Sequence, residues 1–376
     1  MKNFIVLGCI LAVMAGGVSM KHLQLTKAPK ESEFPDIAWN GEKVAVAWMD
    51  GRDGNQEIYV NVADVTSGSK GQAKRITDSA NWDDRPDLTW TGAEFGLTYI
   101  HERKTKFDLI FQRLDENGRP AGGPQKIVAN ESLGKDSAIA WTGAGYGVIY
   151  SKFSGGPDTS QIVFQYVDRQ GRKQGKPVSL TSGSGVKVPS EIIRSGTDFV
   201  VVYYNETEKN VYFMKIDPFG NPKGEKLQLN LADTEAGMPA AANKAGKTLV
   251  CWPQKTENGE QVMVALVTPE GKKLRPPEPV TEPGAERPSV EVAEGEGGFG
   301  LAYIEMQDGK RALYFTVLDD DGKESVEPVR MAKPREVKVF CNKLSMVSTG
   351  DGYVIAWVDK GARINTEIIL SKAVLE

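Results

Sequence analysis

One pattern recurs about every 50 residues and constrains the fold of this chain more than any other feature. In the first three copies a short segment ends in tryptophan, glycine follows two residues later, and a second apolar run comes next. The three segments are Pro35-Asp36-Ile37-Ala38-Trp39, Pro86-Asp87-Leu88-Thr89-Trp90 and Ser137-Ala138-Ile139-Ala140-Trp141. Corresponding residues are 51 positions apart in both intervals. A period of this length, built from short strands, is typical of propellers and stacked arrays.

The aromatic residue that closes the second run can be followed through seven repeats. These landmarks are Trp48, Tyr99, Tyr150, Tyr203, Trp252, Tyr303 and Trp357. A polar loop and an alternating third run follow each landmark, and five of the third runs lead into a turn closed by glycine. Glycine accepts the positive φ that tight hairpins require. Each repeat therefore predicts four short antiparallel strands joined by turns.

Seven such units predict an all-β fold, a seven-bladed β-propeller of four-stranded antiparallel blades. A single blade cannot bury both of its faces, whereas stacked blades bury Val, Ile and aromatic side chains between them. The composition agrees, because 376 residues with 40% apolar residues and 40 glycines suit one large β domain. No linker separates the repeats, so we expect a single propeller domain over residues 20–376.

The seventh repeat shows only three of the four runs, and its third run covers residues 366–373. A candidate for the missing strand lies near the start of the chain, where Leu23-Gln24-Leu25-Thr26 resembles the fourth run Leu227-Gln228-Leu229-Asn230. We therefore expect residues 22–28 to pair with the last blade and close the ring, which removes an open sheet edge. A frayed N-terminal tail is the alternative interpretation.

The first residues have the pattern of a secretory signal peptide. A basic start is followed by an apolar stretch over residues 4–20 that ends in small residues. We expect a signal peptide over residues 1–19, cleaved after Gly17 or Ser19, and an exported protein in the periplasm or outside the cell. The stretch is short for a membrane span, so we expect none in the mature chain. Lipoprotein anchoring at Cys9 is less favoured, because only four apolar residues precede the Gly8-Cys9 pair.

Charge and scarce reactive residues exclude several kinds of site. The formal charge is −4, and the charged residues are interspersed without the basic stripe of a nucleic-acid-binding protein. The two histidines, His22 and His101, are far apart, so a serine triad or a histidine metal site is hard to build. Cys251 and Cys341 belong to repeats that are not neighbours, and we expect free thiols. We expect no cofactor, no nucleic-acid partner and a monomer.

The candidate binding residues lie where the strands meet the loop-bearing face. One set is polar in all seven repeats and follows each landmark by two positions: Asp50, His101, Lys152, Asn205, Gln254, Glu305 and Asp359. A second set comes from nearby loops: Arg52, Asp83, Asp84, Arg85 and Arg287. Together they predict a ring of varied contacts around a shallow pocket. The competing interpretation is that any strand leaving a core becomes polar.

Two finer hypotheses concern these loops. The segment from Asp50 to Glu57 carries carboxylates that could hold Ca²⁺, which takes about six to eight oxygen ligands. Its spacing does not match a calcium loop and its glycines suit a tight turn, so we expect no metal there. Arg85 and Arg287 each precede a proline and are treated as equivalent. They either converge on a carboxylate ligand through forked hydrogen bonds or are solvated.

The string Trp48, Asp50, Arg52, Gly54 and Ile58-Tyr59 resembles the repeats of secreted bacterial propeller proteins of unassigned role. The resemblance spans residues 22–376 and implies architecture, not activity. Sialidase-like propellers are the nearest enzyme class by shape, but their repeated Ser-x-Asp-x-Gly-x-x-Trp box is absent. The signatures of WD and kelch repeats are absent as well.

Two functions remain open. The favoured one is a non-catalytic exported propeller that binds a protein or glycan partner through its loop face. The alternative is a glycan-acting hydrolase or lyase that uses carboxylates and arginines from several blades. Such an enzyme needs a carboxyl pair about 5 to 10 Å apart, and the candidates are Asp83, Asp84, Asp50 and Glu305. A deep axial pocket with converging carboxyl groups favours the enzyme, and a shallow, uneven face favours the binder.

Overall fold

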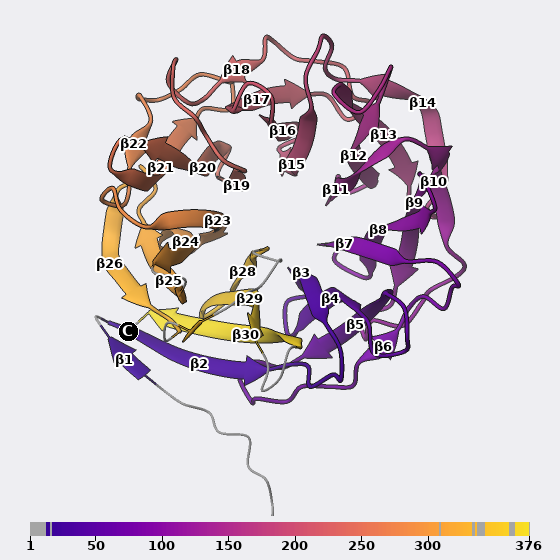
Figure 1. The fold of residues 1–376 in the computed structure, drawn as a ribbon, viewed down its shortest axis with the longest axis horizontal. Coiled ribbons are helices and arrows are strands. Elements are labelled where there is room, and N and C mark those ends of the chain that lie inside the picture. The colour runs from indigo at the N-terminus through magenta and orange to yellow at the C-terminus, as the bar shows by residue number, and fades with distance from the viewer. Residues whose placement is uncertain are drawn as a thin grey trace, which may run out of the picture.

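The structure is a computed structural model that describes residues 13–15, 17–307, 310–332, 335–336, 343–360 and 365–375. Seven antiparallel sheets stand in a ring around a central axis, as the sequence predicts (Figure 1). In each sheet the first strand lies nearest the axis and the fourth lies at the rim. No helix occurs among the described residues, so none there is long and apolar enough to cross a membrane.

The first six blades follow one another along the chain, each made of consecutive strands. Blade 1 contains β3 (Ser32–Trp39), β4 (Val44–Asp50), β5 (Glu57–Ala63) and β6 (Lys74–Arg75). Blade 2 contains β7 (Asp83–Trp90), β8 (Phe95–Arg103), β9 (Lys106–Leu114) and β10 (Gln125–Glu131). Blade 3 contains β11 (Leu133–Trp141), β12 (Gly145–Phe153), β13 (Ser160–Asp168) and β14 (Lys173–Ser179).

The next three blades repeat this order. Blade 4 contains β15 (Lys187–Ser195), β16 (Asp198–Asn205), β17 (Asn210–Ile216) and β18 (Leu227–Gln228). Blade 5 contains β19 (Ala240–Lys244), β20 (Lys247–Thr256), β21 (Gly259–Val267) and β22 (Glu278–Pro279). Blade 6 contains β23 (Glu286–Gly295), β24 (Gly298–Gln307), β25 (Lys310–Leu318) and β26 (Glu324–Arg330), with β27 (Arg335–Glu336) also paired to β25.

Blade 7 joins the two ends of the chain. Its inner strands are β28 (Ser345–Thr349), β29 (Gly352–Lys360) and β30 (Thr366–Leu375), and its outer strands are β2 (Val18–Gln24) and β1 (Val13–Ala15). The ladder between β2 and β30 runs from the pair Val18↔Leu375 to the pair Gln24↔Ile369. The predicted closure is therefore confirmed, although the ladder covers Val18–Gln24 rather than residues 22–28.

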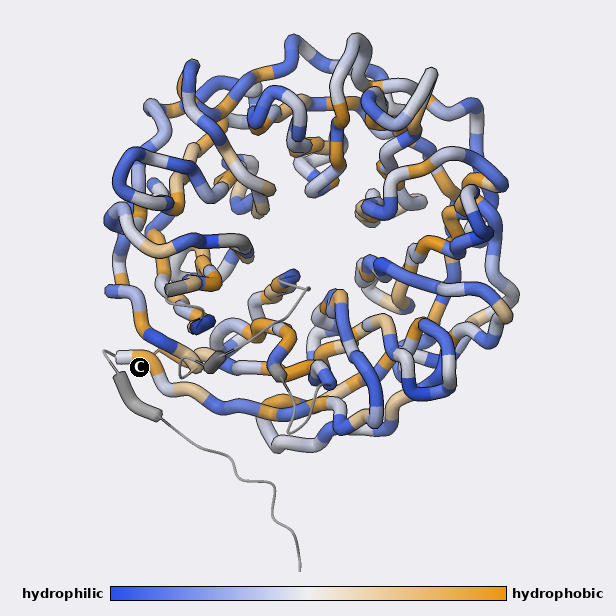
Figure 2. Tube along the Cα trace, in the orientation of Figure 1, coloured by the Kyte–Doolittle hydropathy of each residue, from blue (hydrophilic) through white to orange (hydrophobic). Residues whose placement is uncertain are grey.

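The core consists of seven apolar clusters, each between two neighbouring blades. Between blades 1 and 2, for example, Ala47 and Val60 pack with Leu97 and Tyr99. All seven aromatic landmarks are buried. Figure 2 shows hydrophobic segments in strands around the ring, and β4 is buried at every position, as expected of a strand in a sheet packed on both faces. Cys251 is a buried free thiol, whereas Cys341 and Cys9 lie outside the described residues.

Removing the closing strand is expected to open the ring. A chain that starts at Leu25 lacks β2, so β30 exposes an unpaired edge. Compared with a chain that starts at Val18, we expect a lower melting temperature and concentration-dependent association. Several hydrogen bonds of about 1 kcal/mol each are lost together with the burial of Val18 and Met20. Thermal melting and size exclusion measure both effects, and identical behaviour of the two chains would show that this segment is only a tail.

Candidate functional site

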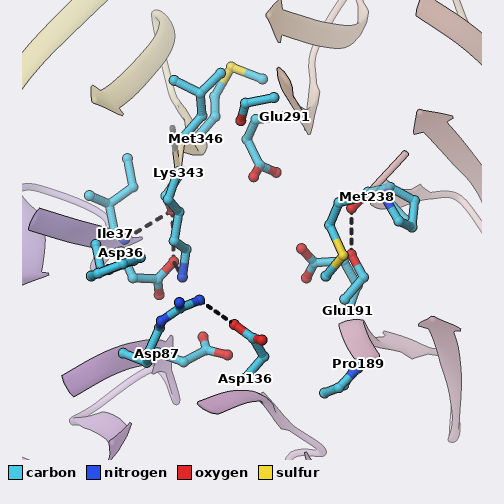
Figure 3. Close-up of a pocket in the computed structure, with 18 of the residues that line it drawn as sticks. Asp36, Ile37, Asp87, Asp136, Pro189, Glu191, Met238, Glu291, Lys343 and Met346 are labelled. Carbon is cyan, nitrogen blue, oxygen red and sulfur yellow. Dashed lines mark hydrogen bonds and ion pairs between the residues drawn. The ribbon is translucent and has the colours of Figure 1, made fainter. Parts of the chain in front are cut away.

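A cavity of about 510 Å³ lies at the axis of the propeller, lined by residues from the innermost strand of every blade or the segment just before it (Figure 3). Its wall is built from equivalent positions, because each blade presents the same register of its first strand to the axis. Two rings of side chains, described below, account for most of the polar lining. The cavity is thus a product of the repeat and of ring closure together.

The inner ring comprises the residues that pair with the position just before each aromatic landmark. They are Asp36, Asp87, Ala138, Glu191, Ala240, Glu291 and Ser345. Four blades therefore place a carboxyl group at the same level of the axis. Figure 3 shows the carboxyl groups of Asp87, Glu191 and Glu291 pointing toward the centre of the cavity.

The second ring lies two residues earlier in each blade and is mixed in character: Phe34, Arg85, Asp136, Pro189, Met238, Ser289 and Lys343. Phe34 and Arg85 have φ of 52° and 53°, at a register shift between the first two strands of their blades. Such bulges turn side chains that would otherwise alternate between the sheet faces. The second ring therefore contributes both of the cations that line the cavity.

Both of these cations already have carboxylate partners. Arg85 Nη1 donates to Asp136 Oδ1 at 2.6 Å, and the Arg85 guanidinium lies 4.1 Å above the ring of Phe34. Lys343 Nζ lies 3.8 Å from Asp36 Oδ1. Burial alone would lower the pKa of Lys343, but the surrounding carboxylates raise it above its ordinary value. Lys343 therefore stays charged and is held by the acidic side of the cavity.

Short inner-ring side chains connect neighbouring blades. Asp36 Oδ2 accepts from the Leu88 backbone N–H of blade 2 at 2.7 Å, and Asp87 Oδ2 accepts from Ile139 N–H of blade 3 at 3.2 Å. At the seam, Ser345 Oγ accepts from Ile37 N–H at 3.1 Å and donates to Asp36 Oδ1 at 2.9 Å. These N–H groups lie on the unpaired edge of the innermost strand, so the side chain of the preceding blade satisfies them. This role is structural.

The two glutamates of the inner ring behave differently. No hydrogen bond or ion pair joins Glu191 to another residue in the described part of the chain. Glu291 Oε1 accepts only from the adjacent Val292 N–H, at 3.1 Å. Burial, together with the neighbouring acids, raises the pKa of Glu191 well above its usual range and that of Glu291 to about 8. Burial and the nearby Asp36 likewise raise the pKa of Asp87. The cavity thus holds more carboxyl groups than its cations compensate.

The residues predicted two positions after each landmark lie elsewhere. Asp50, Asn205, Gln254 and Asp359 are buried beneath the loops, and none of the seven lines the axial cavity. Asp50 Oδ2 accepts from the indole N–H of Trp48 at 2.7 Å, and Gln254 Oε1 accepts from that of Trp252 at 3.3 Å. In these two blades the polar side chain accepts the hydrogen bond of the buried tryptophan's indole N–H.

Two predicted loop clusters are held in ion pairs. His101 Nδ1 lies 2.8 Å from Asp83 Oδ1, and Ser79 Oγ donates to the other oxygen of Asp83 at 3.0 Å. The hydroxyl therefore contacts the carboxylate and not the imidazole, unlike the arrangement of a serine triad. Asp84 lies 3.7 Å from Lys135 Nζ, and Lys152 pairs with Glu131 at 3.0 Å.

The two candidate arginines are not equivalent, contrary to the sequence hypothesis. Arg85 precedes the inner-ring residue of its blade by two positions and lines the cavity, whereas Arg287 precedes Glu291 by four. Arg287 is buried, donates to the Glu260 carbonyl and pairs with Glu305 at 3.1 Å. The two therefore do not converge on one ligand.

The loop from Asp50 to Glu57 uses its carboxylates within the protein. Arg52 donates to both oxygens of Asp50, at 2.8 and 2.6 Å. Glu57 accepts from Arg75 and from Ser79 N–H, each at 3.0 Å. Among the described residues, no group of three or more His, Cys, Asp or Glu side chains is arranged to hold a metal ion.

Sequence reasoning missed the inner ring, although a signal for it was present. Asp36 and Asp87 stand three residues before the tryptophan of the repeat, each directly after a proline and before an apolar residue. Glu191 and Glu291 occupy the same register in blades whose first strand has lost the tryptophan. The loops after the second strand give the stronger signal in the sequence, because the position two residues after each landmark is polar in all seven repeats.

Comparisons with known proteins support the architecture. No protein-family model and no curated protein matches this chain. A solved protein of unknown function from Dyadobacter fermentans is similar over 96% of this chain and 100% of its own, with a TM-score of 0.56 and 11% identity. Polysaccharide lyase Uly1 matches over 93% and 91%, with a TM-score of 0.54 and 8% identity. A prolyl endopeptidase matches over 94% of this chain but 51% of its own, with a TM-score of 0.55 and 12% identity. At these identities the similarity shows the fold alone.

The raised pKa of Glu291 predicts a pH-dependent stability. Because its pKa is about 8 in the folded chain against an ordinary 4.5, the folded state holds this proton more tightly than the unfolded state. The free energy of unfolding should therefore fall as the pH rises from 4.5 to 8. Urea unfolding at several pH values measures the fall, which Glu291→Gln should reduce and the exposed control Glu225→Gln should not. An equal slope in all three proteins would contradict the assignment.

The seam between blades 7 and 1 gives a second prediction. Ser345→Ala removes the acceptor of the Ile37 N–H and a donor to Asp36. We expect a loss of about 1 to 3 kcal/mol in the free energy of unfolding, because a buried N–H is left without a partner. Ser348→Ala is the matched control on the same strand. The hydrogen bonds of the Ser348 hydroxyl are long and weak, at 3.4 Å to the Thr349 carbonyl and 3.5 Å to the Gly352 carbonyl. Equal stability of the two variants would show that the seam bond contributes nothing.

Proposed function

We propose that this protein is a non-catalytic, exported propeller that binds a protein or glycan partner through its axial cavity, and that the partner places a cationic group among the inner-ring carboxyl groups. One observation carries the proposal. Both cations of the lining are already paired, whereas Glu191 and Glu291 face the cavity from blades 4 and 6 without a cationic partner.

The chemistry of the lining favours a cation over an anion. A carboxylate buried without compensation is costly, and an incoming ammonium or guanidinium relieves that cost through charge-assisted hydrogen bonds. A ligand carboxylate would instead meet like charges, and no unpaired cation among the described lining residues could receive it, which costs several kcal/mol in interfaces. The volume of about 510 Å³ suits one long side chain or one sugar ring.

A rigid wall is the second support for binding. The inner strands are tied to one another by side chain to backbone hydrogen bonds at blades 7, 1, 2 and 3. A cavity held in this way loses little conformational entropy when a ligand enters, which improves affinity. The exposed Met238 and the buried Ile37 and Leu88 add apolar contact area beside the carboxyl groups.

The axial position and the converging carboxyl groups also meet a condition that favours a glycan-acting enzyme. The raised pKa of Glu291 suits a general acid, which makes hydrolysis the second candidate. A glycosidase, however, pairs a protonated carboxyl with an ionised one. Burial raises the pKa of Glu191 as well as that of Glu291, so the two glutamates are shifted in the same direction rather than apart. This symmetry favours binding.

The test uses matched ligands that differ only in charge. A lysine-containing peptide and glucosamine are titrated into the protein by calorimetry beside their N-acetylated forms, because acetylation removes the charge. We expect binding of the amines only, and affinity for the peptide that rises from pH 6 to 8 as Glu291 ionises. The double variant Glu191→Gln/Glu291→Gln should weaken binding at least about tenfold, equivalent to about 1.4 kcal/mol, and Glu225→Gln should not.

Two outcomes oppose the proposal. Equal binding of the acetylated ligands, or unchanged affinity in the double variant, would show that recognition does not depend on a cationic group of the partner. Release of new reducing ends from glycans incubated with the wild type, lost in Glu291→Gln, would establish the enzymatic alternative.

A further inference from the structure

The closing strand begins where the predicted leader ends. β2 starts at Val18, directly after the exposed Gly17, whose φ is 77°. The two sites that the sequence offers for removal of the leader, after Gly17 and after Ser19, therefore fall just before this strand and inside it. The fold distinguishes between them.

Val18 belongs to the folded core. Its side chain is 1% exposed, that of Met20 is fully buried, and both join the cluster between blades 6 and 7 with Phe315 and Tyr353. The backbone of β2 pairs with β30 from the first residue, Val18↔Leu375, and continues through Ser19↔Val374. A cut after Ser19 would remove a buried side chain and two pairs of this ladder.

The number of strands points the same way. Blades 1 to 5 each contain four strands, and in the described residues blade 7 has a fifth only because β1 pairs with β2. Without the residues before Val18, blade 7 becomes four-stranded like those blades, with β2 as its outermost strand. Both cuts satisfy the requirement for small residues at the first and third positions before the cut. These residues are Gly17 and Ala15 for the cut after Gly17, and Ser19 and Gly17 for the cut after Ser19. Only the cut after Gly17 leaves the blade whole.

We propose that the leader is removed at the Gly17–Val18 bond, so that the mature chain begins with the first residue of the ring-closing strand. Hydrolysis adds one water across this peptide bond, leaving a carboxyl group on Gly17 and an amino group on Val18. No spacer separates the cut from the strand, so in the precursor β2 is attached directly to the apolar leader. Release of the leader therefore leaves β2 as the first element of the mature chain and as the outermost strand of blade 7. This inference rests on the predicted export and is independent of the ligand.

Two matched substitutions distinguish the two cuts in the full-length chain exported from a bacterial host. Ala15→Leu places a bulky residue at the third position before the Gly17–Val18 bond. It leaves unchanged Gly17 and Ser19, the small residues that precede the other cut. Ser19→Val places one at the Ser19–Met20 bond and keeps a residue suited to a strand. We expect accumulation of precursor with Ala15→Leu and a normally processed chain with Ser19→Val. Intact mass and N-terminal sequencing give the result, with Val18 expected as the first residue.

A first residue at Met20 or beyond, an intact Met1, or a lipid on Cys9 would overturn the assignment. So would normal processing of Ala15→Leu. A separate measurement tests the structural reason: a chain produced with Val18 first should melt at a higher temperature than one with Met20 first. Equal melting would show that Val18 and Ser19 are not needed in the ladder.

Discussion

The ladder between β2 and β30 is the constraint on which the rest of the structure depends. Every apolar cluster lies between two blades, so no blade is complete unless it has a neighbour on each side. The last cluster, between blades 7 and 1, forms only when the chain returns to its start. Backbone hydrogen bonds from the first strand to the last fix that return, because they set the register as well as the contact. The axial cavity exists only in the closed ring.

The innermost strands create a problem that the inner ring solves. Each of these strands has one edge without a ladder partner, and its N–H groups face the neighbouring blade. Asp36, Asp87 and Ser345 supply acceptors across that gap. Where the same position holds a longer side chain, as at Glu191 and Glu291, the carboxyl group extends into the cavity without bonding the next blade. The shorter polar side chains at this position thus both connect neighbouring blades and line the cavity, whereas the two glutamates only line it.

This division explains how the protein tolerates so many acids at its axis. Asp36, which accepts a backbone N–H group and lies 3.8 Å from Lys343 Nζ, is compensated within the fold. The glutamates lack such compensation, and burial raises the pKa values of both. A buried acid that is easily neutralised costs the fold little below its pKa and becomes a strong acceptor when a cation arrives. Under the proposed function, stability and recognition depend on the same two residues.

The sequence by itself determined the architecture of this protein. Seven landmarks at a regular period, turn glycines and the match between Leu23-Gln24-Leu25 and Leu227-Gln228-Leu229 predict the blades and their closure, because strand periodicity and turn chemistry are local properties. The binding residues were another matter. Arg85 is the one predicted residue that lines the cavity. Several residues of the set that follows the landmarks are buried, and Asp50, for example, accepts a structural hydrogen bond from Trp48.

Only the tertiary structure decided which polar residues meet. Asp36, Asp87, Glu191 and Glu291 are separated by 51, 104 and 100 residues in the chain. They converge because each first strand presents the same register to one axis, and bulges at Glu33 to Asp36 and Asp84 to Asp87 turn the preceding residues toward it. The depth of burial, which raises the pKa values of Asp87, Glu191 and Glu291, likewise depends on closure of the ring. The local sequence determines each strand, but the convergence and burial of these acidic residues depend on the assembled propeller.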